Sequence, residues 1–447
     1  MNRTYISEVI DQLGVSKYTY TMYILVGIAL LFDGFDYMIV AYTMPQMAAE
    51  WGLSKVQTGS LTSWSLIGLI IGGLTAGIIS DRIGRKKTLS IFVAMYSLLT
   101  LPIYFVHSFE VFAMLRILSG IGLGACIPIA VTMMTESAPT HKRGFFTSSI
   151  MAFYISGWVV AGIVAITIVP VFGWRVCYLL GGIPALYSLV LWFKMKESPY
   201  WLLSKGREKE AIDVVKTIEI AARGKAGEWP LGRLITPPAP PKVGVSMIFS
   251  KNYRKATLAN WTIYFMGSVL IYGISGWLPT LLVESGFGVV KGYSFAVLQN
   301  IFAIIGAMSI GFFADIIGRR LNVSLSWFFT AVFAILLGFA TTQWQVILFI
   351  IIVGFLMNGA LSSTQPLLTE SYPTEFRSTG VAWAQAFGRL GGFSGPIAAG
   401  FIQQMGAGFT GLFIFFAIPS FIAAAVAFFF VVETKDKAIE KIVSANV

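Results

Sequence analysis

Long runs of apolar residues, separated by short polar segments, make up most of the chain. Twelve such runs begin near Tyr20, Gln57, Thr88, Val111, Phe145, Arg175, Ala256, Ser294, Leu321, Trp344, Ser378 and Gly408. A helix needs about 20 apolar residues to cross a hydrocarbon layer about 30 Å thick. The runs are continuous rather than alternating, which disfavours a membrane β-barrel. The pattern therefore predicts an all-α membrane protein with twelve transmembrane helices.

Composition supports the same class. Of the 447 residues, 56% are hydrophobic and 12% are charged, and the mean hydropathy is +0.76. A soluble globular domain carries about twice that share of charged residues. We therefore expect an integral, multi-pass membrane protein.

The positions of the basic residues predict the topology. If both termini are cytoplasmic, 27 of the 32 Lys and Arg fall in cytoplasmic segments. Three (Lys55, Arg175 and Lys291) fall on the other side, and two (Arg116 and Arg389) lie within spans. This asymmetry is the positive-inside pattern of membrane proteins. It explains the net charge of +11 without nucleic acid as a partner.

The two halves of the chain repeat each other. GIISDRIGRK, which begins at Gly77, recurs as GFFADIIGRR 234 residues later, and TESAPTHKR, which begins at Thr135, recurs as TESYPTEFR at the same offset. A fixed offset indicates a duplicated unit. We predict an amino-terminal six-helix lobe over 1–194, a polar and basic cytoplasmic linker over 195–255 that contains PPAPP, and a carboxy-terminal six-helix lobe over 256–447.

These motifs resemble the signatures of the major facilitator superfamily of transporters. GxxxDxxGR[KR] after the second and eighth spans is similar to that superfamily's cytoplasmic motif, and RILSGIGLG from Arg116 is similar to its fourth-span pattern. The resemblance implies two pseudo-symmetric lobes around a midplane site that faces each side in turn. It implies a monomeric transporter, not an enzyme, with no cofactor and no metal. The chain also lacks the GxxxxGK[ST] loop of ATP-driven proteins.

Charges that recur in both halves are expected to serve the shared scaffold. We expect them to pair across helix junctions when the cytoplasmic side is shut; the alternative is that the basic members only set the topology. The predicted gating residues are Asp81, Arg85, Glu136 and Arg143, with their counterparts Asp315, Arg319, Glu370 and Arg377. Near the ends of the halves, Glu197 also corresponds to Glu433.

Four intramembrane charges occur in one half only and need a separate reason. Asp33, Asp36, Arg116 and Arg389 correspond to Gly267, Leu270, Ile350 and Ile155. Asp33 and Asp36 lie three residues apart in LLFDGFDYMIV and share a helix face. Two carboxylates in low dielectric cannot both ionise cheaply, so at least one is expected to bind a proton.

The two arginines are the natural counterparts of these acids. Arg116 cannot lose its proton, and pairing with a first-span carboxylate would give proton coupling a switchable contact. The alternatives are a permanent structural ion pair, or Arg116 bound to backbone carbonyls. Arg389 has no acid elsewhere in the carboxy-terminal spans and is suited to hold a substrate carboxylate. Its alternative is a structural contact near the outer side.

Aromatic and amide side chains within the spans could complete a binding cavity. Aromatic rings stack on flat substrates, and amides orient polar groups. Each ring could instead serve packing or an interfacial belt. The candidates are Tyr37, Tyr154, Trp158, Tyr264, Trp383, Asn260, Gln365 and Gln385.

Two stretches carry a closer resemblance. DGFD in the first span resembles the DGxD element of the aromatic acid:proton symporters, and YPTEFRSTGVAWAQAFGRLGG resembles the tenth-to-eleventh-span region of that branch, which includes bacterial nicotinate transporters. The resemblance implies Asp33 and Asp36 as coupling acids, Arg116 as their partner and Arg389 as the carboxylate contact. We expect proton-coupled import of a small organic anion, most of all a monocyclic aromatic carboxylate, across a bacterial cytoplasmic membrane.

Three other functions stay open at this point. ESPYWLLSKGREKEA, after the sixth span, is close to a pattern shared with sugar and organic-ion porters. A drug or metabolite:proton antiporter would use the same scaffold in the opposite direction. A transport-inactive binding protein is the third, although intact gating motifs in both halves disfavour it.

Overall fold

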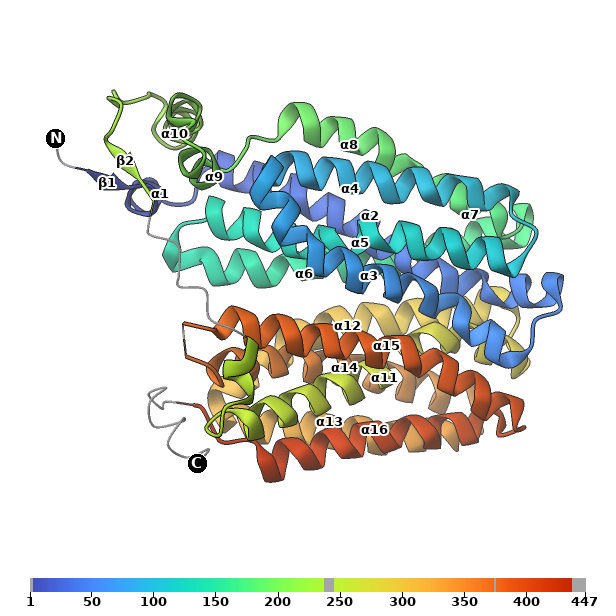
Figure 1. Cartoon of the computed structure of the whole chain (residues 1–447). Coiled ribbons are helices and arrows are strands. Elements are labelled where there is room, and N and C mark those ends of the chain that lie inside the picture. The colour runs from blue at the N-terminus through green and yellow to red at the C-terminus, as the bar shows by residue number, and fades with distance from the viewer. Residues whose placement is uncertain (1–2, 237–244, 374, 436–447) are drawn as a thin grey trace.

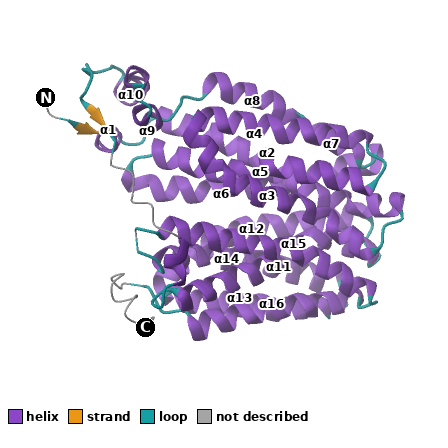
Figure 2. Ribbon diagram, viewed as in Figure 1, coloured by secondary structure: helices purple, strands orange, loops and turns teal. Residues whose placement is uncertain are grey.

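The computed structural model describes residues 3–236, 245–373 and 375–435, and these are almost entirely helical (Figure 2). Two helical bundles lie side by side with their helices roughly parallel (Figure 1). The first and last described segments, near Arg3 and Lys435, lie at the same end of the molecule (Figure 1). We call this the termini end and the opposite one the far end.

Each bundle contains six membrane-length segments. The first bundle consists of α2 (Lys17–Trp51), α3 (Lys55–Ile83), α4 (Arg85–Thr100) continued by η1 (Leu101–Phe105), α5 (Phe109–Ser137), α6 (Thr140–Phe172), and α7 (Arg175–Leu180) followed by α8 (Ile183–Lys194). The second consists of α11 (Arg254–Glu284), α12 (Val289–Ile317), α13 (Arg319–Gly338), α14 (Gln343–Glu370), α15 (Arg377–Gln404) and α16 (Gly408–Phe430). The prediction of twelve spans is confirmed.

One span differs from the others in polarity. Among the described residues, eleven spans are long and apolar enough to cross a membrane by length and composition, and α15 is not one of them. α15 packs against both α11 and α3. It carries polar residues within its length, among them Gln385 and Arg389.

The predicted linker contains a small folded unit. It includes α9 (Pro199–Ser204), α10 (Glu208–Arg223), β2 (Leu234–Ile235) and η2 (Val245–Phe249). β2 pairs in parallel with β1 (Thr4–Tyr5), which leads into α1 (Ile6–Leu13). A separate apolar cluster joins α1, α10 and β2. Its buried residues are Ile6, Val9, Ile212, Val215 and Leu234. The PPAPP motif falls within 237–244, outside the described residues.

The two bundles meet through α3 with α15, α6 with α12, and α2 with α11. Near the far end the contact needs glycine. A Cβ added at Gly59 would lie 2.2 Å from the backbone oxygen of Pro396, and one added at Gly400 would lie 2.5 Å from that of Lys55. Small residues thus allow the helices of the two lobes to approach closely at this end.

Twin glycines turn the chain at the termini end. Gly84 joins α3 to α4 with φ +102°, and Gly318 joins α12 to α13 with φ +98°. The Glu197 carboxylate accepts from the backbone N–H of Arg85 at 2.8 Å. Glu433 likewise accepts from the backbone N–H of Arg319 at 2.9 Å. In both lobes a carboxylate from beyond the last span satisfies the exposed N–H groups that begin a helix.

Gly84→Ala should destabilise the protein. The backbone conformation at this position costs a side-chain-bearing residue about 1–3 kcal/mol. An added Cβ would also lie 2.2 Å from Oε2 of Glu197. The measurement is thermal unfolding in detergent, with Gly77→Ala in α3 as control because nothing lies within 4 Å of a Cβ there. Equal unfolding temperatures for the two variants would contradict this account of the turn.

Candidate functional site

A buried ion pair ties α2 to α5 inside the amino-terminal lobe. Nη1 of Arg116 donates to Oδ2 of Asp36 at 2.8 Å, and both side chains are fully buried. Nη2 of Arg116 donates to the backbone oxygen of Asp36 at 3.1 Å, and its Nε donates to Oγ of Ser65 at 2.9 Å. The second oxygen of Asp36 accepts from Thr100 at 2.7 Å. Each nitrogen of the Arg116 guanidinium and each carboxylate oxygen of Asp36 therefore takes part in a hydrogen bond, as a buried charge pair requires.

Asp33, one turn away on α2, is in the opposite situation. Its side chain is 1% exposed, and neither carboxylate oxygen has a hydrogen-bond partner among the described residues. It lies close enough to Arg389 of α15 for electrostatic interaction, and also to Tyr154 and Tyr272. A buried carboxylate without partners is far cheaper to hold in its neutral, protonated form.

Arg389 reaches across the boundary between the lobes. It lies near the middle of α15, and its Nη1 donates to the backbone oxygen of Leu69 in α3 at 2.9 Å. It forms no ion pair with a carboxylate among the described residues. A Cβ at Gly73 would lie 2.1 Å from the same Nη1, so a small residue on α3 makes room for the guanidinium.

Four aromatic rings lie close together near Asp33 and Arg389. Tyr37 lies 5.5 Å from Tyr272 and 6.1 Å from Trp158, measured between ring centroids, and Trp158 lies 5.7 Å from Tyr154. Three of these rings belong to the amino-terminal lobe and Tyr272 to the carboxy-terminal lobe. We call Tyr37, Tyr154, Trp158 and Tyr272 the aromatic cluster. It brings rings from both lobes to one place beside Asp33 and Arg389.

A polar group lies on the termini side of Arg389. Oε1 of Gln365 accepts from the Tyr264 hydroxyl at 2.5 Å and from Nε2 of Gln385 at 3.3 Å. Trp383 is 40% exposed and stacks on Trp261 with centroids 6.3 Å apart.

Asn260 belongs to a different environment. It is fully buried, and its Nδ2 donates to Oγ of Ser371 at 3.2 Å. This bond links α11 to the end of α14 near the termini end, within the carboxy-terminal lobe.

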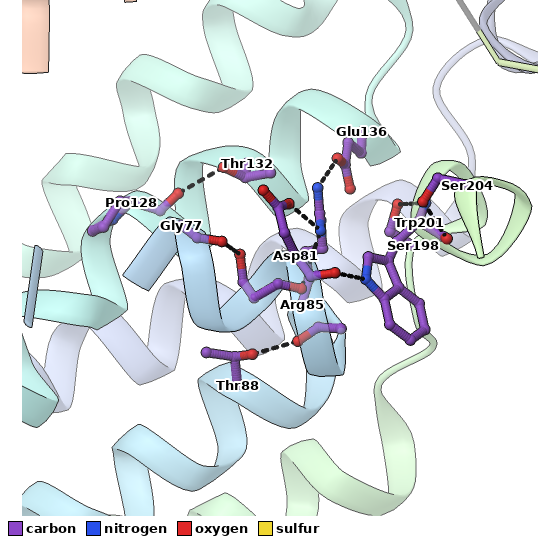
Figure 3. A network of polar contacts seen from close by, with 12 residues as sticks. Gly77, Asp81, Arg85, Thr88, Pro128, Thr132, Glu136, Ser198, Trp201 and Ser204 are labelled. Atoms are coloured by element: carbon purple, nitrogen blue, oxygen red, sulfur yellow. Dashed lines mark hydrogen bonds and ion pairs between the residues drawn. The ribbon is translucent and has the colours of Figure 1, made fainter. Parts of the chain in front are cut away.

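Three of the four predicted gating charges of the amino-terminal lobe, Asp81, Arg85 and Glu136, form one network (Figure 3). Arg85 donates to Asp81 at 2.8 Å and to Glu136 at 3.3 Å. The indole N–H of Trp201, in α9, donates to the backbone oxygen of Asp81 at 2.9 Å. The network therefore joins α3, α4, α5 and the linker within one lobe. Arg143 is half-buried, and its Nε has no partner among the described residues.

The carboxy-terminal lobe repeats part of this network. Nε of Arg319 donates to Glu370 at 3.5 Å, and Thr434 also donates to Glu370. Nε of Arg377 donates to the backbone oxygen of Tyr372 at 3.2 Å. The side chain of Asp315 lies outside the described part of the structure. In both lobes the described gating contacts stay within the lobe.

Direct hydrogen bonds between the lobes occur only at mid-depth and towards the far end in the described part of the chain. At the far end, Lys55 and Glu284 form an ion pair of 2.6 Å. The others are Ser63 to the backbone oxygen of Phe393 at 2.8 Å, Asn300 to Tyr42 at 3.3 Å, and Arg389 to the backbone oxygen of Leu69. The lobes are thus joined at the far end, and no such bond holds them together at the termini end among the residues described.

Sequence reasoning missed several of these partners. Thr100 and Ser65 complete the Asp36–Arg116 pair, yet hydroxyl residues are common in spans and gave no signal. The Lys55–Glu284 pair was also missed, although Glu284 is the counterpart of Glu50 at the 234-residue offset. The two glutamates have different partners: Glu284 pairs with the other lobe, whereas Glu50 forms an ion pair of 2.6 Å with Arg175 inside its own lobe.

Asp36→Asn should destabilise the protein by about 3–5 kcal/mol, because Arg116 would keep a buried charge without compensation. Asp33→Asn should leave stability nearly unchanged, since no described residue forms a hydrogen bond with the Asp33 side chain. Thermal unfolding in detergent measures both. The double variant Asp36→Leu, Arg116→Met should recover most of the loss. Equal losses for the two single variants would contradict the assignment of the pair.

Comparison with known proteins identifies the family. The model of the family described as Major Facilitator Superfamily matches residues 26–310 and 296–445. The niacin transporter NiaP of Acinetobacter baylyi is 31% identical over 97% of this chain and 98% of its own length. The gallate transporter of Pseudomonas putida is 32% identical over 94% and 93%, and the 4-hydroxybenzoate transporter PcaK of Acinetobacter baylyi is 30% identical over 94% and 92%.

Solved structures agree on the fold. The crystal structure of a D-xylose-proton symporter matches with a TM-score of 0.74 and 19% identity, covering 94% of this chain and all of the other. The inward open conformation of the xylose transporter XylE from E. coli gives the same TM-score at 20% identity over 96% and 99%. Family model, full-length relatives and fold all agree: the chain belongs to the Major Facilitator Superfamily and is a multi-pass membrane transporter, not an enzyme.

Proposed function

We propose that this transporter imports a small aromatic carboxylate together with protons. The observation that carries the proposal is that Asp33, from one lobe, lies within range of electrostatic interaction with Arg389, from the other, beside the aromatic cluster. Niacin, gallate and 4-hydroxybenzoate, the substrates in the names of the three relatives, are small aromatic compounds. A guanidinium, a protonatable acid and flat rings are the groups that such a substrate and a proton need.

Asp33 is the proposed proton-binding group. Both of its oxygens are buried and have no hydrogen-bond partner among the residues described, which favours the protonated form while the site is empty. Asp36, in contrast, accepts hydrogen bonds from both Arg116 and Thr100. Asp36 and Arg116 then act on coupling indirectly, as a fixed ion pair one turn away from Asp33.

Arg389 is the proposed contact for the substrate carboxylate. A guanidinium has five N–H donors, and only one hydrogen bond from Arg389 is present among the described residues. A carboxylate can accept two of the remaining donors in a bidentate pair. The ring of the substrate would then pack against the aromatic cluster, where Tyr37 and Tyr272 come from opposite lobes. The substrate would thereby contact both lobes at once.

The positions of the bonds between the lobes indicate which side of the site is closed. We place the termini end in the cytoplasm of a bacterium, in accord with the basic residues at that end, and the far end outside the inner membrane. The inter-lobe bonds from Lys55–Glu284 to Arg389–Leu69 would hold the outer side shut. Rocking of lobes 1–194 and 256–447, connected by 195–255, would break them and open the site outward. The pairs around Asp81 and Glu136 and their counterparts would reorganise in that step. The transporter would work as a monomer.

Asp33→Asn should abolish accumulation of the substrate driven by a pH gradient, because an amide cannot carry the proton. Exchange of labelled for unlabelled substrate should persist, since it needs no net proton movement. The measurement is uptake of 4-hydroxybenzoate and nicotinate into proteoliposomes with and without an imposed gradient. Accumulation at the level of the unaltered protein would overturn the assignment of Asp33.

Arg389→Ala should weaken substrate binding at least tenfold, since a charge-assisted bidentate contact is worth about 1.5–3 kcal/mol. Arg389→Lys should recover only part, because an ammonium lacks the planar fork. Binding is measured by isothermal titration with the same two acids, and Arg175→Lys, at the far end, is the control. Unchanged affinity in Arg389→Ala would exclude Arg389 as the carboxylate contact.

A further inference from the structure

A second polar layer lies beside the proposed carboxylate contact. Gln385 and Arg389 are four residues apart on α15 and therefore share one face. On α11, Tyr264 and Tyr272 are eight residues apart and also share a face. Arg389 and Tyr272 form the layer nearest Asp33. Gln385 and Tyr264, joined through Gln365, form the next layer towards the termini end.

The hydrogen bonds of this layer leave specific groups open. A primary amide has two donors and an acceptor oxygen. Oε1 of Gln365 is occupied by Tyr264 and Gln385, whereas the Gln365 amide nitrogen and Oε1 of Gln385 have no partner among the described residues. Gln365 is half-buried and Gln385 is exposed. The layer thus offers a donor and an acceptor side by side, and neither amide is fully buried.

On α15, Gln385 and Arg389 are about one helical turn apart, and a turn of about 5.4 Å is comparable to the width of a single aromatic ring. Tyr264 and Tyr272 are about two turns apart on α11, so the spacing that fits a small ring is the one on α15. A substrate whose carboxylate binds Arg389 can therefore direct the opposite edge of its ring at Gln365 and Gln385.

We infer that Gln385 and Gln365 select aromatic acids that carry a hydrogen-bonding group on the ring edge away from the carboxylate. A hydroxyl would donate to Oε1 of Gln385, and a hydroxyl oxygen or a ring nitrogen would accept from the Gln365 amide. Tyr264 acts as a positioning residue, because its bond fixes which way the Gln365 amide faces. This inference rests on the proposed function and adds the class of ring substituent to it.

Physical chemistry gives the direction of the selectivity. A site that offers hydrogen bonds to a substituent disfavours the analogue that lacks it, since the polar groups of the site are then left without partners. The protein should therefore transport 4-hydroxybenzoate with a lower KM than benzoate. Both acids have the same carboxylate and ring, so the contacts to Arg389 and the aromatic cluster are matched between them.

The test is the ratio of KM for benzoate to KM for 4-hydroxybenzoate in proteoliposome uptake. Gln385→Leu should reduce this ratio about 3- to 10-fold, which corresponds to the loss of one hydrogen bond. Tyr264→Phe, a smaller change to the packing, should reduce it less, because Gln365 stays present but loses its orientation. Gln404→Leu makes the same chemical change at an exposed position at the far end of the same helix and should leave the ratio unaltered.

The outcomes separate the two proposals. Transport of both acids by the unaltered protein with equal KM, or an unchanged ratio in both Gln385→Leu and Tyr264→Phe, would overturn the inference while leaving aromatic acid transport in place. Failure of the unaltered protein to transport or bind any aromatic acid would overturn the proposed function itself. A reduced ratio in Gln385→Leu with Gln404→Leu unaffected supports both.

Discussion

The structure depends on how charge is held in a medium of low dielectric. A charge buried between transmembrane helices must be paired and hydrogen-bonded, or it must be neutralised by a proton. The two acids of the first span represent the two solutions. Asp36 lies in a saturated pair with Arg116, braced by Ser65 and Thr100, and links four helices of its lobe. Asp33 has no such partner in the described part of the chain and lies within electrostatic range of Arg389 in the other lobe.

This contrast separates scaffold from moving parts. The Asp36–Arg116 pair lies within one lobe and need not break when the lobes move. The contacts of Arg389 with Leu69 and of Tyr37 with Tyr272 cross the boundary, so a relative movement of the lobes must change them. A substrate and a proton bound at this boundary would therefore affect the same equilibrium as the movement itself.

The duplicated architecture shows which features belong to the shared unit. The turn at Gly84 with Glu197 and the turn at Gly318 with Glu433 are built in the same way, since in both a carboxylate approaches a helix start too closely for any Cβ. The proposed substrate site, in contrast, combines an acidic residue from one lobe with a basic residue from the other. Asymmetry laid over a symmetric scaffold lets two similar lobes do different jobs: the amino-terminal lobe supplies Asp33 and most of the aromatic cluster, and the carboxy-terminal lobe supplies Arg389 and the amide layer.

The sequence by itself determined the membrane class, the twelve spans and the duplication, because apolar run length and a fixed repeat offset are local properties of the chain. It also singled out Asp33, Asp36, Arg116 and Arg389, since charges inside apolar runs are costly wherever they lie. Only the tertiary structure decided that Arg116 pairs with Asp36 rather than Asp33, because both acids lie on one helix face and the choice depends on where α5 crosses α2. The same holds for the folded unit within the linker and for the Lys55–Glu284 pair, whose partners lie 229 residues apart. The number of residues between two such partners does not show that they will meet, because their contact depends on how the helices pack.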